Sequence, residues 1–263
     1  MRGTAGRSSR RRGGAQVRAG AAAIALAVGM VACHGGASRP PSAAPSVNVA
    51  ITQVSTVRRG LRSACKKLRA VAGGEGNRTG QMAAAGRETA EAAAHWSALL
   101  EASGGSGPGP YTAHPQWTRA GEEIRAAIAE MAGRIDADDP EGAYRACGRA
   151  CGRFVAMDET AGVRLASDAL YRFRQTARPL GEVIARGDLA SVRGALPALE
   201  AFRDSALSRP GAGSSTPAEQ AALLREFRED VARFLAAVAA ENGVRGAYER
   251  MMLTLERAFD SVL

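Results

Sequence analysis

Apolar residues recur at intervals of three and four along most of the chain after residue 47. The clearest run consists of Trp117, Ile124, Ile128, Met131 and Ile135. Because an α-helix turns once every 3.6 residues, this spacing places the apolar side chains along one face of a helix. No segment after residue 47 shows the strict alternation of apolar and polar residues that marks a half-buried strand. The pattern therefore predicts an all-α protein.

Interruptions of the apolar pattern divide the chain after residue 46 into eight predicted helices. Stretches rich in Gly, Ser and Pro at 73–80, 104–110 and 209–216 cannot hold helix, so we expect loops there. The predicted helices cover 47–72, 80–103, 116–137, 140–157, 162–186, 188–208, 217–241 and 244–262.

Capping residues and prolines refine these boundaries. Asp139 and Thr216 each precede a proline and an acidic residue, which is typical of a helix start. Thr216 also has Glu219 three residues later, the spacing of a reciprocal capping box. Pro179 and Pro197 fall inside two predicted helices and should kink or shorten them.

The two halves of the chain repeat each other in the order of their apolar positions. Residues 121–135 match a second apolar run at a constant offset of 103. This second run consists of Leu224, Phe227, Val231, Phe234 and Val238. We therefore expect an internal duplication of two up-and-down four-helix bundles, at 47–157 and 162–263. The link between them is poor in linker residues, so an alternative is that the fourth and fifth helices run together over one shared core.

The charge of the chain is concentrated in its first 33 residues. The formal net charge is +9, with 35 basic and 26 acidic residues. Residues 1–33 contain six arginines and no acidic residue, which leaves 29 basic against 26 acidic residues, or +3, for the rest. A basic surface for nucleic acid is therefore excluded as the main interpretation.

The basic leader has the features of an export signal. Its arginines are followed by an apolar run at 21–32, which is too short for a membrane-spanning helix. The run ends in Met30-Val31-Ala32-Cys33, which resembles the lipobox of bacterial lipoproteins. The resemblance implies a signal peptide at 1–32 and an acylated Cys33 that anchors the mature protein in a lipid bilayer.

The residues after Cys33 indicate where the anchored protein would lie. Residues 33–46 are rich in Gly, Ser, Pro and Ala, the composition of a flexible tether. His34 stands where inner-membrane lipoproteins usually carry Asp. We therefore expect an exported protein, held at the periplasmic face of the outer membrane or at the cell surface.

Three further cysteines fall on the apolar stripes of two predicted helices. Cys65 lies in the first helix, and Cys147 and Cys151 lie in the fourth. A disulfide from Cys65 to either of the other two is expected in an oxidising compartment. A bond between Cys147 and Cys151 is disfavoured, because side chains four apart on a helix have Cβ atoms about 5 to 6 Å apart. Inert core thiols and a copper or zinc site are the alternatives, with His95 as a further candidate ligand.

Within residues 50–157, Trp96 is followed by a Gly/Pro loop, by Trp117 and by cysteines near the end of the fourth predicted helix. This layout of the first predicted bundle resembles the cytochrome c-prime family of exported four-helix bundles. The resemblance implies covalent haem attachment through a Cys-x-x-Cys-His motif. The chain departs from that motif, because three residues separate Cys147 from Cys151 and Gly152 stands in place of the histidine. We therefore predict no cofactor, and keep haem as the alternative alongside copper or zinc.

Enzyme signatures are missing from the sequence. It contains no phosphate-binding glycine loop, no nucleophile elbow and no His-Glu-x-x-His motif. The charged residues of 168–182 indicate a solvated helix face, and they are Asp168, Arg172, Arg174, Arg178 and Glu182. We therefore expect no enzyme but a binding or scaffolding lipoprotein, whose partner is an envelope protein or a small ligand. The alternative function is a haem- or metal-binding electron-transfer protein.

Overall fold

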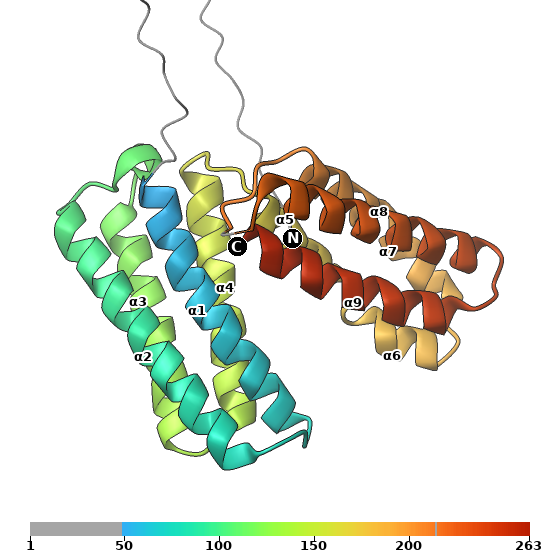
Figure 1. Ribbon diagram of the computed structural model, residues 1–263, viewed down its shortest axis with the longest axis horizontal. Helices are drawn as coiled ribbons and strands as arrows, with labels where there is room; N and C mark the ends of the chain where they lie inside the picture. The colour runs from blue at the N-terminus through green and yellow to red at the C-terminus, as the bar shows by residue number, and fades with distance from the viewer. Residues whose placement is uncertain (1–48, 214) are drawn as a thin grey trace, which may run out of the picture. The chain divides into compact units, whose positions relative to one another are not determined.

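The computed structural model describes residues 49–213 and 215–263, and every regular element within them is a helix (Figure 1). The prediction of an all-α bundle fold is therefore confirmed. The expected signal peptide, Cys33 and the tether to residue 46 lie outside the described residues. The described residues belong to one compact unit.

The first four α-helices form bundle 1. They are α1 (Val49–Ala72), α2 (Arg78–Ser103), α3 (Trp117–Asp136) and α4 (Pro140–Thr160), with a short 3₁₀ helix, η1 (Gly109–Ala113), between α2 and α3. α1 packs on α2 and α4, and α3 packs on the same two helices. This ring of antiparallel neighbours buries four apolar stripes in one interior.

Aromatic side chains fill the end of bundle 1 that lies next to η1. Trp96 packs edge-on against Phe154 and Trp117, with ring centroids 5.0 and 5.8 Å apart. Tyr111 of η1 contacts Trp117 at a centroid distance of 5.5 Å. The indole N–H of Trp96 is satisfied by the carbonyl of Gly121 at 3.0 Å. These residues therefore serve as core packing in the structure.

Bundle 2 repeats this arrangement of neighbours. Its helices are α5 (Ala166–Ala177), α6 (Leu180–Ala185), α7 (Leu189–Leu207), α8 (Pro217–Ala239) and α9 (Val244–Val262). α5 packs on α7 and α9, and α8 packs on the same two helices. The helix pair α8–α9 thus corresponds to α3–α4. The equivalent residues Ile128 and Val231 are both buried, as are Met131 and Phe234.

Two prolines inside predicted helices behave differently. The bounds 162–186 expected for one helix are wrong, because the helix begins only at Ala166. It is broken into α5 and α6 at Pro179, as expected of a proline at that position. Proline lacks the N–H that continues the helix ladder. Pro197 lies within α7, yet the helix continues to Leu207.

The predicted caps at the helix starts are confirmed. The carboxylate of Asp139 accepts the backbone N–H of Gly142 at 2.8 Å. Thr216 and Glu219 form the reciprocal capping box that begins α8. Each side chain satisfies a backbone N–H that the first turn of a helix leaves without a partner.

The buried apolar residues divide into two clusters at the junction of the bundles. The first cluster ends with Val163 and Leu165, and the second begins with Ala166. α4 ends at Thr160, so the fourth and fifth helices do not run together. The structure therefore shows two cores joined by a short connection.

Candidate functional site

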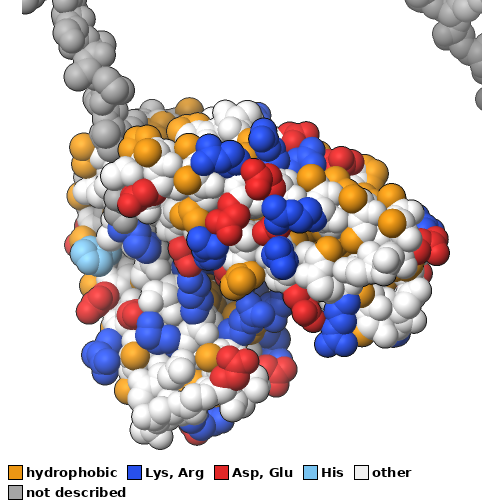
Figure 2. Space-filling model, turned by 45° about the vertical axis from the view of Figure 1, so that its right-hand side comes forward, with side chains coloured by type: hydrophobic (Ala, Val, Ile, Leu, Met, Phe, Trp, Pro, Cys, Tyr) orange, Lys and Arg blue, Asp and Glu red, His pale blue; other side chains and the backbone are white. Residues whose placement is uncertain are grey.

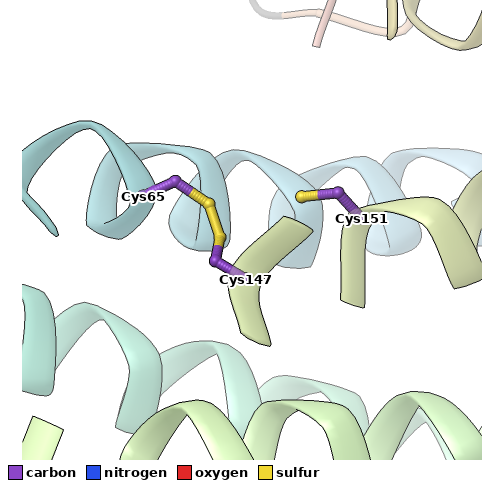
Figure 3. A group of neighbouring side chains, drawn as sticks. All are labelled: Cys65, Cys147 and Cys151. Atoms are coloured by element: carbon purple, nitrogen blue, oxygen red, sulfur yellow. A yellow bond between two sulfur atoms is a disulfide. The ribbon is translucent and has the colours of Figure 1, made fainter. Parts of the chain in front are cut away.

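The three cysteines of the folded part lie together where α1 packs on α4 (Figure 3). Cys65 and Cys147 form a disulfide across the two helices, with Cα atoms 6.0 Å apart. This separation falls in the usual range for disulfides. Both residues are buried, because each occupies the apolar stripe of its helix.

Cys151 is a free thiol one helical turn beyond Cys147. The three sulfur atoms all lie within 4.8 Å of one another. Burial raises the pKa of the Cys151 thiol, although the positive charges of Arg58, Arg62 and Arg174 oppose the shift. The thiol is therefore protonated at neutral pH and is a poor nucleophile.

A small cavity between the bundles opens beside Cys151. Arg58, Arg62 and Arg174 reach it from α1 and α5, and Tyr171 and Phe259 complete much of its wall. The guanidinium of Arg62 lies over the ring of Phe259, with its central carbon 3.9 Å from the ring centroid. The cysteine cluster is thus covered by cationic side chains rather than by metal-ligating histidines.

A buried ion network adjoins this cavity and connects the two bundles. Arg58 of α1 donates one hydrogen bond to Asp158 of α4 at 2.6 Å and another to Asp168 of α5 at 2.7 Å. The three side chains are 4%, 0% and 1% exposed. Tyr111 donates its hydroxyl to the other oxygen of Asp158 at 2.7 Å. The network is therefore closed to solvent and hydrogen-bonded on several sides, as buried charges require.

The low-dielectric surroundings change the ionisation of this network. Burial raises the pKa of Asp158 to about 7, even though Arg58 favours the carboxylate. Burial also raises the pKa of Tyr111 and keeps it neutral. For Arg58, burial opposes the charge, but the attraction of Asp168 and Asp158 outweighs it and raises the pKa.

The predicted solvated face at 168–182 needs correction. Asp168 is buried in the ion network, because the first turn of α5 faces α1. Arg174 is also largely covered and pairs with Glu256 of α9 at 2.9 Å. Charge spacing along one helix does not reveal that a second bundle packs against it.

Sequence reasoning missed Arg58 as well. It lies between Val54 and Leu61 on the apolar stripe of α1, so its spacing marks it as an inward-facing charge. A charge at such a position requires a buried partner. The partners themselves lie 100 and 110 residues away and leave no local signal.

His95 is not part of the cysteine cluster. It is exposed on α2 and lines a groove with Gln53 and Thr56 of α1. The groups of candidate metal ligands among the described residues consist of the three cysteines alone. The helices of the described ranges include none that is long and apolar enough to cross a membrane.

Comparison with family models, with curated proteins and with solved structures finds no match to this chain. The function proposed below therefore rests on the residues of this chain.

Proposed function

We propose that this protein is an exported lipoprotein, anchored through an acylated Cys33, that presents a disulfide-tied pair of helical bundles at the cell envelope. Its role is binding or scaffolding. The leader at 1–32 and the Gly-, Ser- and Pro-rich tether at 33–46 support export and anchoring. The double bundle would then stand off the bilayer at the end of the tether.

The disulfide between Cys65 and Cys147 is the observation that carries this proposal. Disulfides form and persist in oxidising compartments and are rare in the cytosol. A bond that ties α1 to α4 therefore agrees with the export signal, although the two features are separate in sequence. Both support a location outside the cytoplasm.

Metal binding is a second candidate, favoured by the sulfur atoms of Cys65, Cys147 and Cys151 within 4.8 Å of one another. In the reduced protein, three thiolates at this spacing suit copper(I) or zinc. The disulfide and a three-thiolate site exclude each other, since the bonded sulfurs are not thiolates. Haem is less well supported, because Cys147 is bonded to Cys65 and residue 152 is glycine.

Fractionation of cells tests the anchor. We expect the wild-type protein to be cleaved before Cys33 and to sediment with membranes, because about 0.8 kcal/mol per buried acyl CH₂ gives stable anchoring when several chains are attached. Cys33→Ser should be soluble or unprocessed. Cys151→Ser is the matched control and should stay with the membranes. Wild-type protein that is soluble and cleaved at another position would contradict the proposal.

A further inference from the structure

A hollow of about 750 Å³ lies between the two bundles, apart from the cysteine cluster. It is lined by the end of α1, the start of α4, one side chain of α9 and Arg178, which follows α5. Lysine and arginine side chains gather around this hollow in Figure 2. The cations that line it are Lys66, Arg69, Arg145 and Arg178.

The cations on the α1 side of the hollow share two carboxylates with Arg62 and Arg174, which lie outside its lining. Glu256 forms ion pairs with Arg62, Arg69 and Arg174, and Asp260 pairs with Arg62 and Lys66. The two carboxylates of Glu256 and Asp260 are therefore shared among four cations. The contact from Arg69 to Glu256 is the longest of these, at 3.8 Å. Arg69 is thus the least tightly held of these cations.

The other charged side chains that line the hollow cancel one another. Glu141 and Arg145 pair with each other at 2.6 Å and cancel. Glu75 lines the hollow, and no ion pair to it is found among the described residues. The negative charge of Glu75 offsets the positive charge of Arg178. The side chains that line the hollow, four cations and the carboxylates of Glu75, Glu141 and Glu256, thus sum to an excess of one positive charge.

The guanidinium of Arg178 is positioned by Tyr144 and has N–H donors left for a ligand. It lies over the ring of Tyr144, 4.9 Å from the centroid, and donates a hydrogen bond to the Tyr144 hydroxyl. Within residues 49–213 and 215–263, it has no carboxylate at ion-pair distance. One hydrogen bond leaves several of its five N–H donors for a ligand. Stacking on an aromatic ring reduces the freedom that the guanidinium would lose on binding.

We propose that this hollow binds a phosphate dianion, either free or as the monoester of a small soluble molecule. The proposal rests on the binding role proposed above and names its ligand class. The excess of positive charge around the hollow favours an anion over a neutral or cationic ligand. Arg178 supplies planar N–H donors that suit phosphate oxygens. Because Arg178 belongs to bundle 2, and Lys66, Arg69 and Tyr144 belong to bundle 1, the ligand would join the two bundles.

Calorimetric titration of the purified full chain tests the proposal at pH 8 and constant chloride. Inorganic phosphate and glycerol phosphate are the probes, and the tighter of the two identifies free phosphate or a monoester. We expect saturable binding of one ligand per chain. Arg178→Gln should weaken it about tenfold, the effect of losing one charge-assisted hydrogen bond. Arg193→Gln, at an exposed pair with Glu241 away from the hollow, is the control and should leave the affinity unchanged.

A variant that tightens binding is also needed, because misfolding could weaken binding but would not tighten it. Glu75→Gln removes the unpaired carboxylate and should tighten binding about two- to fivefold. Heats that do not saturate with either probe would overturn the proposal. So would equal weakening by Arg178→Gln and Arg193→Gln, or an unchanged affinity in Glu75→Gln. Titration does not depend on the lipid anchor, so failure here and failure in fractionation remain distinguishable.

Discussion

At the scale of single residues, Arg58 connects three helices from its position on α1. It holds Asp158 at the end of α4 and Asp168 at the start of α5. Removing one partner from a buried ion pair leaves an uncompensated charge, which is strongly destabilising. A network of this kind therefore favours one arrangement of the two bundles over others that hydrophobic packing alone would allow.

The ionisation of Asp158 should make stability depend on pH. Its folded-state pKa of about 7 lies above the value of about 3.9 expected in the unfolded chain. Between these values the folded state binds the additional proton, so the free energy of unfolding falls as pH rises from about 4 to 7 and then levels off. Carboxyls with lowered pKa, such as Asp139 and Asp188, act only below this range.

Urea unfolding at pH 5 and pH 8 measures this effect. We expect the wild-type protein to be more stable at pH 5, and Asp158→Asn to lose most of the difference, because an amide does not titrate. Asp204→Asn, at an exposed carboxyl, should keep the wild-type pH dependence. A wild-type protein that is equally stable at both pH values would show that Asp158 stays ionised.

At the scale of elements, helix ends follow local chemistry more closely than helix interiors do. Thr216 begins α8 through hydrogen bonds exchanged with Glu219, and all of the atoms involved lie within four residues. Pro179 breaks a helix where Pro197 does not, although both sit in apolar helical patterns. A proline in a helical pattern therefore does not by itself show whether the helix ends there.

Loss of the α8 cap should be measurable. We expect Thr216→Ala to lower the free energy of unfolding by about 1 kcal/mol, since the side chain satisfies a backbone N–H at the helix start. Thr56→Ala is the matched control. The Thr56 hydroxyl bonds back to the carbonyl of Thr52 within an exposed part of α1, so its removal should be nearly neutral. Equal losses in urea unfolding would rule out a capping contribution.

At the scale of the whole folded part, the two bundles are joined by several contacts of different kinds. Arg59 of α1 donates a hydrogen bond to the carbonyl of Leu263 at 3.0 Å, and the hydroxyl of Tyr171 in α5 donates one to the carbonyl of Gly148 in α4 at 3.1 Å. Arg62 adds ion pairs to α9 across the junction. Because these contacts are distributed, loss of any single one should loosen the junction without separating the bundles.

The disulfide stabilises bundle 1 across a long loop. It joins residues 82 apart in sequence, and closing such a loop restricts the unfolded chain. We expect reduction to lower the free energy of unfolding by about 2 to 4 kcal/mol. Cys151→Ser should retain this response, because the free thiol takes no part in the bond.

Peptide mapping of the non-reduced protein identifies the bonded pair. We expect a crosslink between Cys65 and Cys147, with Cys151 alkylated. Three free thiols, or a thiol count that changes when copper or zinc is removed, would instead favour the metal candidate.

The all-α class, the caps and the duplicated order of helices could be predicted from the sequence, because each depends on residues close together along the chain. The loops could be predicted too, except that α2 begins at Arg78, inside the predicted loop at 73–80. Apolar spacing also placed Cys65, Cys147 and Cys151 on stripes that face one interior. The choice of Cys147 rather than Cys151 as the partner of Cys65 could not be predicted, since it depends on the register of α1 against α4.

Arg58 meets Asp158, 100 residues away, because α1 packs on α4 within bundle 1. Its contact with Asp168 and the cationic hollow arise only when the two bundles pack together.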